Sequence, residues 1–205
     1  MYRYCKRAMD FLLALVGGAV CLPFMLLIVL AVRLDSPGPA LFTQTRVGVG
    51  KRHFTIYKFR TMYIDTPAEV PTHELGAADC HITRVGRFLR KTSLDELPQL
   101  WNILVGDMAI VGPRPALWNQ FDLIAARDAY VGRFGLTPNT VRPGLTGWAQ
   151  VHGRDELSIP EKARLDGEYV QGFGFAMDCR CVLMTVGVVA KAEGIVEGGA
   201  AKRQD

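Results

Sequence analysis

The sequence has no CxxC pair, no spacing typical of a metal site, and only five cysteines in 205 residues. This odd, scattered set favours a reducing compartment over a disulfide framework. Charged residues make up 21% and hydrophobic residues 49%, which excludes both a disordered tail and a polytopic transporter. Internal repeats and an interdomain linker are also absent. A chain of this length therefore predicts one domain with its own core.

The net charge alone does not decide between classes of binding partner. A net charge of +4 fits nucleic acid, a lipid headgroup or a phosphorylated substrate. The glycines of residues 47–51 lack the GxGxxG spacing of a phosphate loop, and no helical pattern follows them. Aromatic residues do not interleave with a basic run and no RNA-binding motif occurs, so nucleic acid is not an expected partner.

Only one long apolar run is present. Residues 11–32 contain no charged residue, and a helix of about 22 residues is about 33 Å long, the thickness of one hydrocarbon core. Pro23 lies within this run and has no N–H group, which predicts a bend near Leu22 and Pro23. We therefore expect membrane contact.

Basic residues flank the apolar run on both sides, which bears on its topology. Arg3, Lys6 and Arg7 precede it, and a larger basic set follows from Arg33 onward. A crossing helix would leave one of these sets outside, so a re-entrant helix fits the positive-inside rule better. A single span with a tolerated proline and a cleaved signal peptide are the alternatives, although the run continues past its best cleavage site at 18–21.

Beyond the membrane segment the pattern predicts an α/β (α+β) fold. Residues 40–47 and 53–62 favour strands on either side of a glycine turn, which indicates a β-hairpin. Residues 63–82 and 142–154 are expected to be loops. Apolar spacing predicts helices at 84–91, 93–106, 116–134, 159–171 and 181–190, the last in the core or on the bilayer surface.

The expected organisation has three parts. Residues 1–35 form the membrane helix with its basic start, residues 36–191 form the catalytic domain, and residues 192–205 form a flexible tail.

The adjacent carboxylates of Asp95 and Glu96, here called the dyad, are the strongest candidates for catalytic residues. A structural role is the alternative, because Ser93 three residues before Glu96 matches a capping box. Pro98 argues against a plain helix start, since it removes a helical hydrogen bond. Neighbouring carboxylates on a helix project about 100° apart, so one can face a reacting atom while the other holds a cation.

Basic residues collect in the same polar segments as the dyad. Arg114 stands out among them, because Pro113 and Pro115 fix the backbone on both sides of a guanidinium suited to bidentate phosphate contacts. Two carboxylates, a divalent cation and several basic side chains together predict a phosphoryl-transfer site. The other basic candidates are Lys58, Arg60, Arg87, Arg90, Lys91, Arg142 and Arg154.

Four separated motifs form a recognisable set: SPGPALFTQTRVGVGKRHFTIYKFRTM, RVGRFLRKTSLDELPQLWNILVGDMAIVGPRP, VRPGLTGWAQVHGR and LDGEYV. In this order the chain resembles the bacterial sugar transferase family, the monotopic phosphoglycosyl transferases, over nearly its whole length. The short form of the family is expected, because the multi-span N-terminal region of the long forms is absent.

The resemblance implies a covalent mechanism. Asp95 would attack the β-phosphate of a UDP-sugar, release UMP, and pass the phosphosugar to a polyprenyl (undecaprenyl) phosphate. Glu96 would coordinate Mg²⁺, and Arg90 and Arg114 match positions near the phosphates. The remaining candidates for substrate binding are Lys58, Arg60, Arg142, Gln150 and Arg154.

The resemblance also implies an architecture and a location. A re-entrant membrane helix would precede a compact, mainly helical catalytic domain with a small β-hairpin and amphipathic membrane-surface helices. This places the chain on the cytoplasmic face of the bacterial inner membrane, with membrane lipid as a partner and a homodimer left open. Leu22 stands where the family often has a serine before the proline, which removes a hydroxyl that could bond to the backbone at the bend.

Two other functions compete with this one. A membrane-tethered basic module that binds RNA or anionic lipid without catalysis would explain the charge and the anchor. A phosphatase acting on polyprenyl phosphates would release free phosphate and no UMP.

Overall fold

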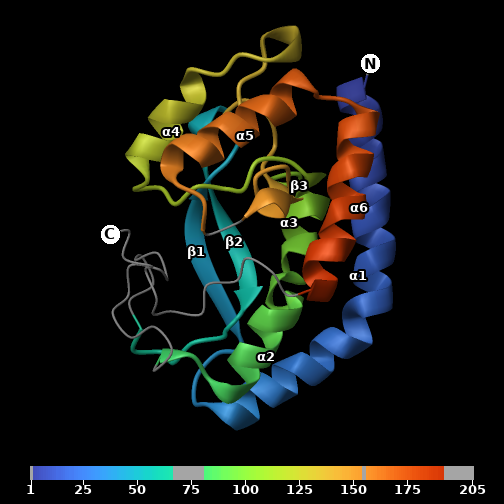
Figure 1. Cartoon of the computed structure of the whole chain (residues 1–205). Coiled ribbons are helices and arrows are strands. Elements are labelled where there is room, and N and C mark those ends of the chain that lie inside the picture. Colours follow the sequence, from blue (N-terminus) through green and yellow to red (C-terminus); the bar gives the residue numbers. More distant parts are fainter. Residues whose placement is uncertain (1, 67–80, 154–155, 192–205) are drawn as a thin grey trace.

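A long N-terminal helix, α1 (Tyr2–Asp35), borders the rest of the chain along one side (Figure 1). The computed structural model describes residues 2–66, 81–153 and 156–191. α1 stays helical through Pro23, and its axis changes direction along its length in Figure 1. A proline in a helix interior removes one hydrogen bond and crowds the preceding turn, which accounts for a bent axis. Within the described residues, α1 is the helix long and apolar enough to cross a membrane.

The predicted hairpin is confirmed. β1 (Leu41–Val47) and β2 (His53–Phe59) pair antiparallel over their whole length. A 3-10 turn, η1 (Val49–Lys51), joins them, and Gly50 within it takes a left-handed φ of 63°. The hairpin therefore ends at Phe59, directly after Lys58.

The sequence prediction does not include a second sheet, which the structure contains. β3 (Ala109–Val111) pairs in parallel with β4 (Gly144–Thr146). The two strands approach closely at Gly144, where a Cβ would lie 2.1 Å from the backbone nitrogen of Gly112. The prediction of a loop over 142–154 is wrong at β4, because a strand of three residues is too short to show the period of two.

The helices divide differently from the prediction. The helix predicted over 159–171 is confirmed. The prediction of a single helix over 93–106 is wrong, because a one-turn 3-10 segment, η4 (Leu94–Glu96), precedes a shorter helix there. The helix predicted over 116–134 is also shorter in the structure. The helices are α2 (Arg84–Thr92), α3 (Gln99–Val105), α4 (Phe121–Asp128), α5 (Ile159–Gln171) and α6 (Phe175–Lys191). The tail at 192–205 and most of the predicted loop at 63–82 lie outside the described residues.

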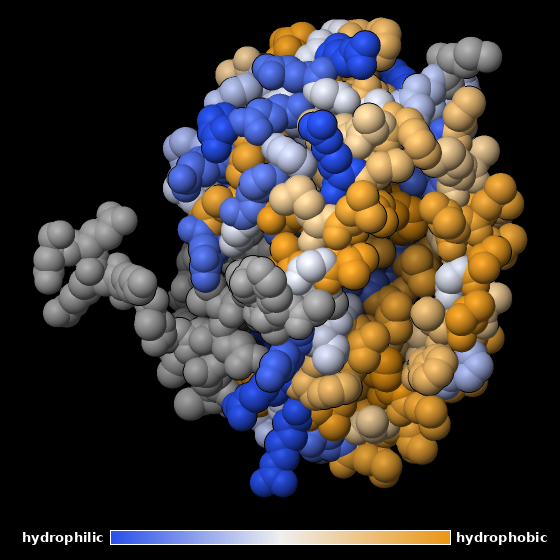
Figure 2. Space-filling model, turned by 45° about the vertical axis from the view of Figure 1, so that its right-hand side comes forward, coloured by the Kyte–Doolittle hydropathy of each residue, from blue (hydrophilic) through white to orange (hydrophobic). Residues whose placement is uncertain are grey.

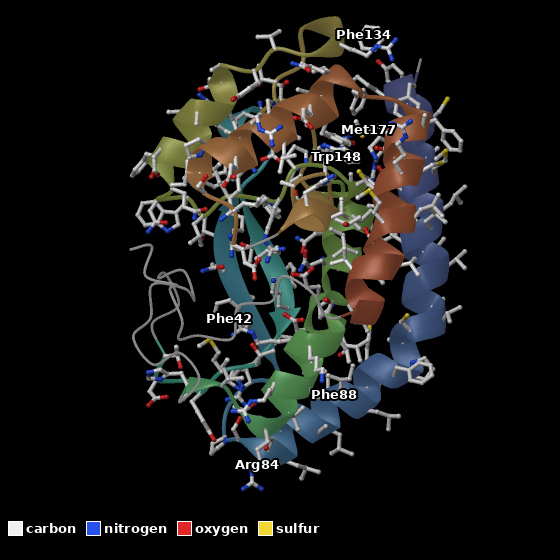
Figure 3. The ribbon with its side chains drawn as sticks, viewed as in Figure 1. Phe42, Arg84, Phe88, Phe134, Trp148 and Met177 are labelled. Carbon is white, nitrogen blue, oxygen red and sulfur yellow. The ribbon has the colours of Figure 1, made fainter. Side chains whose placement is uncertain are left out.

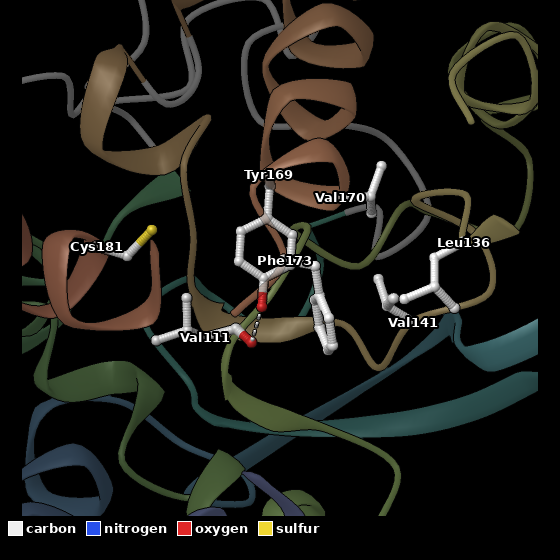
Figure 4. Packing of buried hydrophobic residues seen from close by; sticks show 7 residues of the cluster. All are labelled: Val111, Leu136, Val141, Tyr169, Val170, Phe173 and Cys181. Carbon is white, nitrogen blue, oxygen red and sulfur yellow. Dashed lines mark hydrogen bonds between the residues drawn. The ribbon is translucent and has the colours of Figure 1, made fainter. Parts of the chain in front are cut away.

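Part of the core lies where α5, α6 and β3 meet (Figure 4). Tyr169 of α5 is buried there, and its hydroxyl donates to the Val111 carbonyl at 3.1 Å. Trp148 and Met177, labelled near each other in Figure 3, pack against this cluster. This packing fixes α5 and α6 relative to the β3–β4 sheet and thus to the loop that follows β3.

One face of the molecule is strongly apolar. Figure 2 shows a broad hydrophobic surface on the side formed by α1 and α6. Exposed side chains from both helices supply it, and Phe88 of α2 and Trp101 of α3 are exposed as well. Those of α1 and α6 include Phe11, Leu12, Leu13, Val16, Val20, Leu22, Phe24, Leu26, Leu27, Leu30, Val182, Leu183 and Val186.

Candidate active site

The carboxylate dyad lies in the short connection between α2 and α3. Ser93 ends α2 with a left-handed φ of 57°, and its N–H donates to the carbonyls of Arg90 and Leu89. The Ser93 side chain makes no capping hydrogen bond to η4, so the capping-box interpretation is wrong. The sharp reversal at Ser93 instead places Asp95 and Glu96 in one 3-10 turn, ahead of Pro98 at the N-cap of α3.

Two basic side chains from distant parts of the chain meet at Glu96. Lys58 Nζ, from the end of β2, donates to Glu96 Oε1 at 2.8 Å, and Arg114 Nη1 lies 3.4 Å from the same oxygen. The Lys58 and Glu96 side chains are 16% and 18% exposed, whereas that of Arg114 is 39% exposed. Partial burial strengthens these charge interactions relative to those on an open surface.

Asp95 is half-buried beside this cluster. Burial, together with the negative charge of Glu96, raises the pKa of Asp95 to about 6, against the lowering effect of Lys58, Arg90 and Arg114. The carboxyl is therefore ionised near neutral pH and less stabilised as an anion than an ordinary surface aspartate. A desolvated carboxylate with cations around it suits attack on a phosphorus atom.

The structure brings together five of the predicted site residues and places the others elsewhere. The five are Lys58, Arg90, Asp95, Glu96 and Arg114.

Two predicted arginines, Arg60 and Arg142, donate to backbone carbonyl groups away from the dyad. The Arg60 guanidinium is buried and donates to the carbonyls of Pro37 and Ser36, directly after α1. Arg142 Nε donates to the Gly106 carbonyl at 2.9 Å. These two arginines hold loops in this structure.

The side chain of Gln150 is also engaged within the fold. Gln150 is buried, and its Nε2 donates to the Leu145 carbonyl at 3.0 Å. Arg154 lies outside the described residues.

Asn102 is a buried polar residue near the site that the sequence interpretation missed. Its side chain is fully buried in α3, where Nδ2 donates to the Thr55 carbonyl at 2.7 Å and Oδ1 accepts from the Tyr57 N–H at 3.2 Å. These bonds tie α3 to β2 one residue before Lys58. A lone asparagine in the apolar stretch LWNILV is the signal that could have found it, because a buried amide needs partners.

The donor set fits a magnesium ion shared with a substrate. Among the described residues no group of three or more His, Cys, Asp or Glu side chains could cage a metal. Mg²⁺ is commonly held by one or two carboxylates together with substrate phosphates and water, and the adjacent carboxylates of Asp95 and Glu96 match that pattern. A caged structural metal is therefore a poorer fit to these residues than an ion that arrives with a diphosphate.

The family model and the individual relatives that match the chain agree on one family. The sequence model of the family described as "Bacterial sugar transferase" matches residues 1–192. The chain is 44% identical to the UDP-glucose:undecaprenyl-phosphate glucose-1-phosphate transferase of Caulobacter vibrioides, over 88% of this chain and 68% of that protein. It is 39% identical to the sugar transferase EpsL of Bacillus subtilis, over 93% of this chain and 89% of that protein.

A longer relative shares only part of its length. The undecaprenyl-phosphate glucose phosphotransferase of Komagataeibacter xylinus is 38% identical over 88% of this chain, which spans 35% of that protein.

Proposed function

The chain belongs to the bacterial sugar transferase family, and on this premise we propose that it transfers a phosphosugar from a UDP-sugar to a polyprenyl phosphate. The Caulobacter relative is named for such a transfer from UDP-glucose to undecaprenyl phosphate. The observation that carries the proposal is the half-buried Asp95 beside Glu96, whose Oε1 lies within 2.8 Å of Lys58 Nζ. The transferase names of the relatives give no support to a non-catalytic RNA- or lipid-binding module.

The reaction would proceed in two displacements at one phosphorus atom. A carboxylate oxygen of Asp95 bonds to the β-phosphorus of the UDP-sugar, and the bond from that phosphorus to the bridging oxygen breaks, which releases UMP. A phosphate oxygen of the polyprenyl phosphate then bonds to the same phosphorus, and the Asp95 oxygen leaves. The products are UMP, a polyprenyl diphosphate sugar and the original carboxylate.

The basic residues supply charge neutralisation in both steps. Lys58, Arg90 and Arg114 surround the dyad, where they can hold the negative oxygens of the diphosphate and of the transferring phosphoryl group. Glu96, with Asp95 beside it, would hold the Mg²⁺ ion, which neutralises phosphate charge when bound. Glu96 also orients Lys58 and Arg114 before substrate arrives.

We also propose that the apolar face of α1 and α6 lies in the cytoplasmic leaflet of the inner membrane with α1 re-entrant. Both ends of α1 contact the same domain, which supports this placement. Near its start, Arg7 donates to the carbonyls of Ile103 and Leu104 at 2.5 and 2.8 Å. At its end, Asp35 Oδ2 accepts from the Val85 N–H of α2 at 2.9 Å. A helix that crossed the bilayer would have to give up one set of contacts.

Buried charge at the start of α1 adds to this argument. Lys6 Nζ bonds to Asp178 of α6 at 2.6 Å, and both side chains are 9% exposed. The Tyr2 hydroxyl donates to the same carboxylate oxygen at 2.5 Å. Separating a buried ion pair leaves uncompensated charges and costs about 3–5 kcal/mol, so these contacts oppose export of the N-terminus.

A labelling experiment tests the topology. Cys5 of α1 is exposed, so a variant that keeps it as its one cysteine reports the side on which the N-terminus lies. We expect a membrane-impermeant thiol reagent to label Cys5 only after the cells are permeabilised. In the same background, Pro23→Ala straightens the helix and should yield a labelled fraction in intact cells, because about 33 Å of apolar helix can then cross. Labelling of the unaltered helix in intact cells would contradict the re-entrant placement.

The pH dependence of turnover tests the electrostatics of the dyad. Because Asp95 must be ionised to attack and its pKa is raised to about 6, kcat/KM should fall as the pH drops through about 6. Lys58 lowers this pKa, so Lys58→Met should move the acidic limb to higher pH and also slow the reaction. Lys51→Met, at an exposed ion pair with Asp128 in the hairpin turn, is the control and should leave the limb in place. An unshifted limb in Lys58→Met would mean that Asp95 is not the titrating group.

The reaction itself is tested with a panel of UDP-sugars, Mg²⁺ and undecaprenyl phosphate in detergent or nanodiscs. UMP release that requires the UDP-sugar supports the proposal. Release of inorganic phosphate from undecaprenyl phosphate without UMP would instead identify a phosphatase.

A further inference from the structure

The loop that carries Arg114 is held by its carbonyl groups. Pro113 and Pro115 have no N–H donors, so this segment cannot be fixed by a ladder of its own amides. The Pro113 carbonyl accepts from the Gly144 N–H at 2.9 Å. The Pro115 carbonyl accepts from Arg46 Nη1 at 3.0 Å. The carbonyl between them, that of Arg114 itself, accepts from Arg127 Nη2 at 2.8 Å.

Arg127 reaches this carbonyl from a buried ion pair between α4 and α5. Its Nε and Nη2 donate to Asp166 Oδ2 at 2.8 and 2.6 Å. The side chains of Arg127 and Asp166 are 5% and 1% exposed, so both are almost fully enclosed. Nη2 carries two hydrogens, which allows it to serve the carboxylate and the Arg114 carbonyl together. A lysine has one flexible ammonium and cannot reproduce this planar arrangement.

The position of Arg114 matters because its guanidinium reaches the dyad. Nη1 lies 3.4 Å from Glu96 Oε1, and the side chain is 39% exposed. A shift of the backbone that carries this side chain would move the guanidinium relative to the dyad. A displacement of about 1 Å in a charge-stabilising group can cost about 100-fold in rate.

We infer that Arg127, oriented by Asp166, is a positioning residue that fixes the Arg114 backbone so that the Arg114 guanidinium faces the transferring phosphoryl group. This inference rests on the proposed function for its catalytic consequence. Its structural part, the dependence of the 113–115 loop on Arg127, stands independently. The alternative is that the buried pair only packs α4 against α5.

A double-mutant cycle separates these roles. Arg127→Lys keeps a charge beside Asp166 and loses the bond to the Arg114 carbonyl, and we expect kcat to fall about 10- to 100-fold. In an Arg114→Ala background the same substitution should change kcat by less than about twofold, because the group that it positions is gone. Two results would overturn the inference. One is a loss of kcat in the double variant that equals the product of the losses in Arg127→Lys and Arg114→Ala. The other is a kcat for Arg127→Lys that equals that of wild type.

Two further measurements keep the test decisive. If Arg127→Lys does not fold, the uncharged pair Arg127→Met with Asp166→Leu replaces it, since neutral packing of a former ion pair is commonly tolerated. Arg164→Lys is the matched control, because Arg164 forms an exposed ion pair with Glu168 on α5, and its turnover should stay within about twofold of wild type.

Hydrogen exchange of a peptide covering residues 111–118 gives a readout that does not require turnover. Exchange should be faster in Arg127→Lys than in wild type and unchanged in Arg164→Lys. Unchanged exchange in Arg127→Lys would overturn the positional claim. A wild-type protein that releases no UMP from any UDP-sugar would refute the proposed function, and exchange would still decide whether Arg127 holds the loop.

Discussion

Replacing Asp95 by asparagine is expected to reduce UMP release at least about 10³-fold, the scale of loss seen when a nucleophile is removed. The amide nitrogen and oxygen have nearly the shape of the carboxylate, so the 3-10 turn that holds Asp95 should persist. Steady-state UMP release from a UDP-sugar with undecaprenyl phosphate measures the effect.

The same substitution should stabilise the fold above about pH 6. The folded-state pKa of Asp95, about 6, lies above the ordinary value of 3.8. The unfolded chain therefore gives up this proton first as the pH rises, and ionisation destabilises the folded state progressively from about pH 4 to about pH 6. Asp95→Asn removes that penalty, so its Tm should exceed that of wild type by more at about pH 7.5 than at about pH 4.

A matched control distinguishes the site from a general effect of losing a carboxylate. Asp128 forms an ion pair with Lys51, and its side chain is 45% exposed. Asp128→Asn should leave turnover close to that of wild type. Near-normal turnover in Asp95→Asn would refute the nucleophilic role.

Replacing Glu96 by glutamine is expected to lower kcat about 100-fold and to raise the Mg²⁺ concentration needed for half-maximal rate. Glutamine keeps an oxygen for Lys58 but removes the negative charge that attracts Arg114 and that would hold the proposed Mg²⁺ ion. A Mg²⁺ titration at saturating UDP-sugar measures both effects. Glu161→Gln, at an exposed capping position of α5, is the control.

This substitution also moves the pH profile in the direction opposite to Lys58→Met. The negative charge of Glu96 raises the pKa of Asp95, so its removal should lower the pKa and shift the acidic limb of kcat/KM to lower pH. An unchanged metal titration in Glu96→Gln would contradict its role as a ligand.

The parts of the fold that could be predicted are those with strong local patterns. The alternation around a glycine turn predicted the hairpin, and apolar spacing predicted α5, which in the structure begins with a capping box formed by Ser158 and Glu161. Asp95 and Glu96 were predicted as a functional pair because adjacent carboxylates near Pro98 are unusual in a plain helix start.

The parts that could not be predicted depend on contacts between distant segments. Periodicity presents residues 93–106 as one helix, whereas in the structure they divide into the 3-10 turn η4 and the helix α3, which begins after Pro98. The contact of Arg127 with Arg114 depends on how α4 packs beside α5, which no local spacing encodes.

The arginines illustrate the same limit. Arg60 and Arg114 stand in comparable basic motifs, yet Arg60 is buried against the carbonyls of Ser36 and Pro37 while Arg114 reaches Glu96. Residue type and motif membership therefore identify candidates, and tertiary packing decides which of them surround the dyad.

The central claim is that Asp95 carries the phosphosugar between the two substrates, and mass spectrometry of the trapped protein tests it most directly. The protein is mixed with a UDP-sugar and Mg²⁺ without polyprenyl phosphate, quenched in acid within seconds, and digested. We expect UMP release of up to one equivalent and a phosphosugar adduct on the peptide that contains Asp95, and we expect this adduct to disappear when undecaprenyl phosphate is added before the quench. UMP release that requires undecaprenyl phosphate from the first turnover, with no adduct on that peptide, would contradict it.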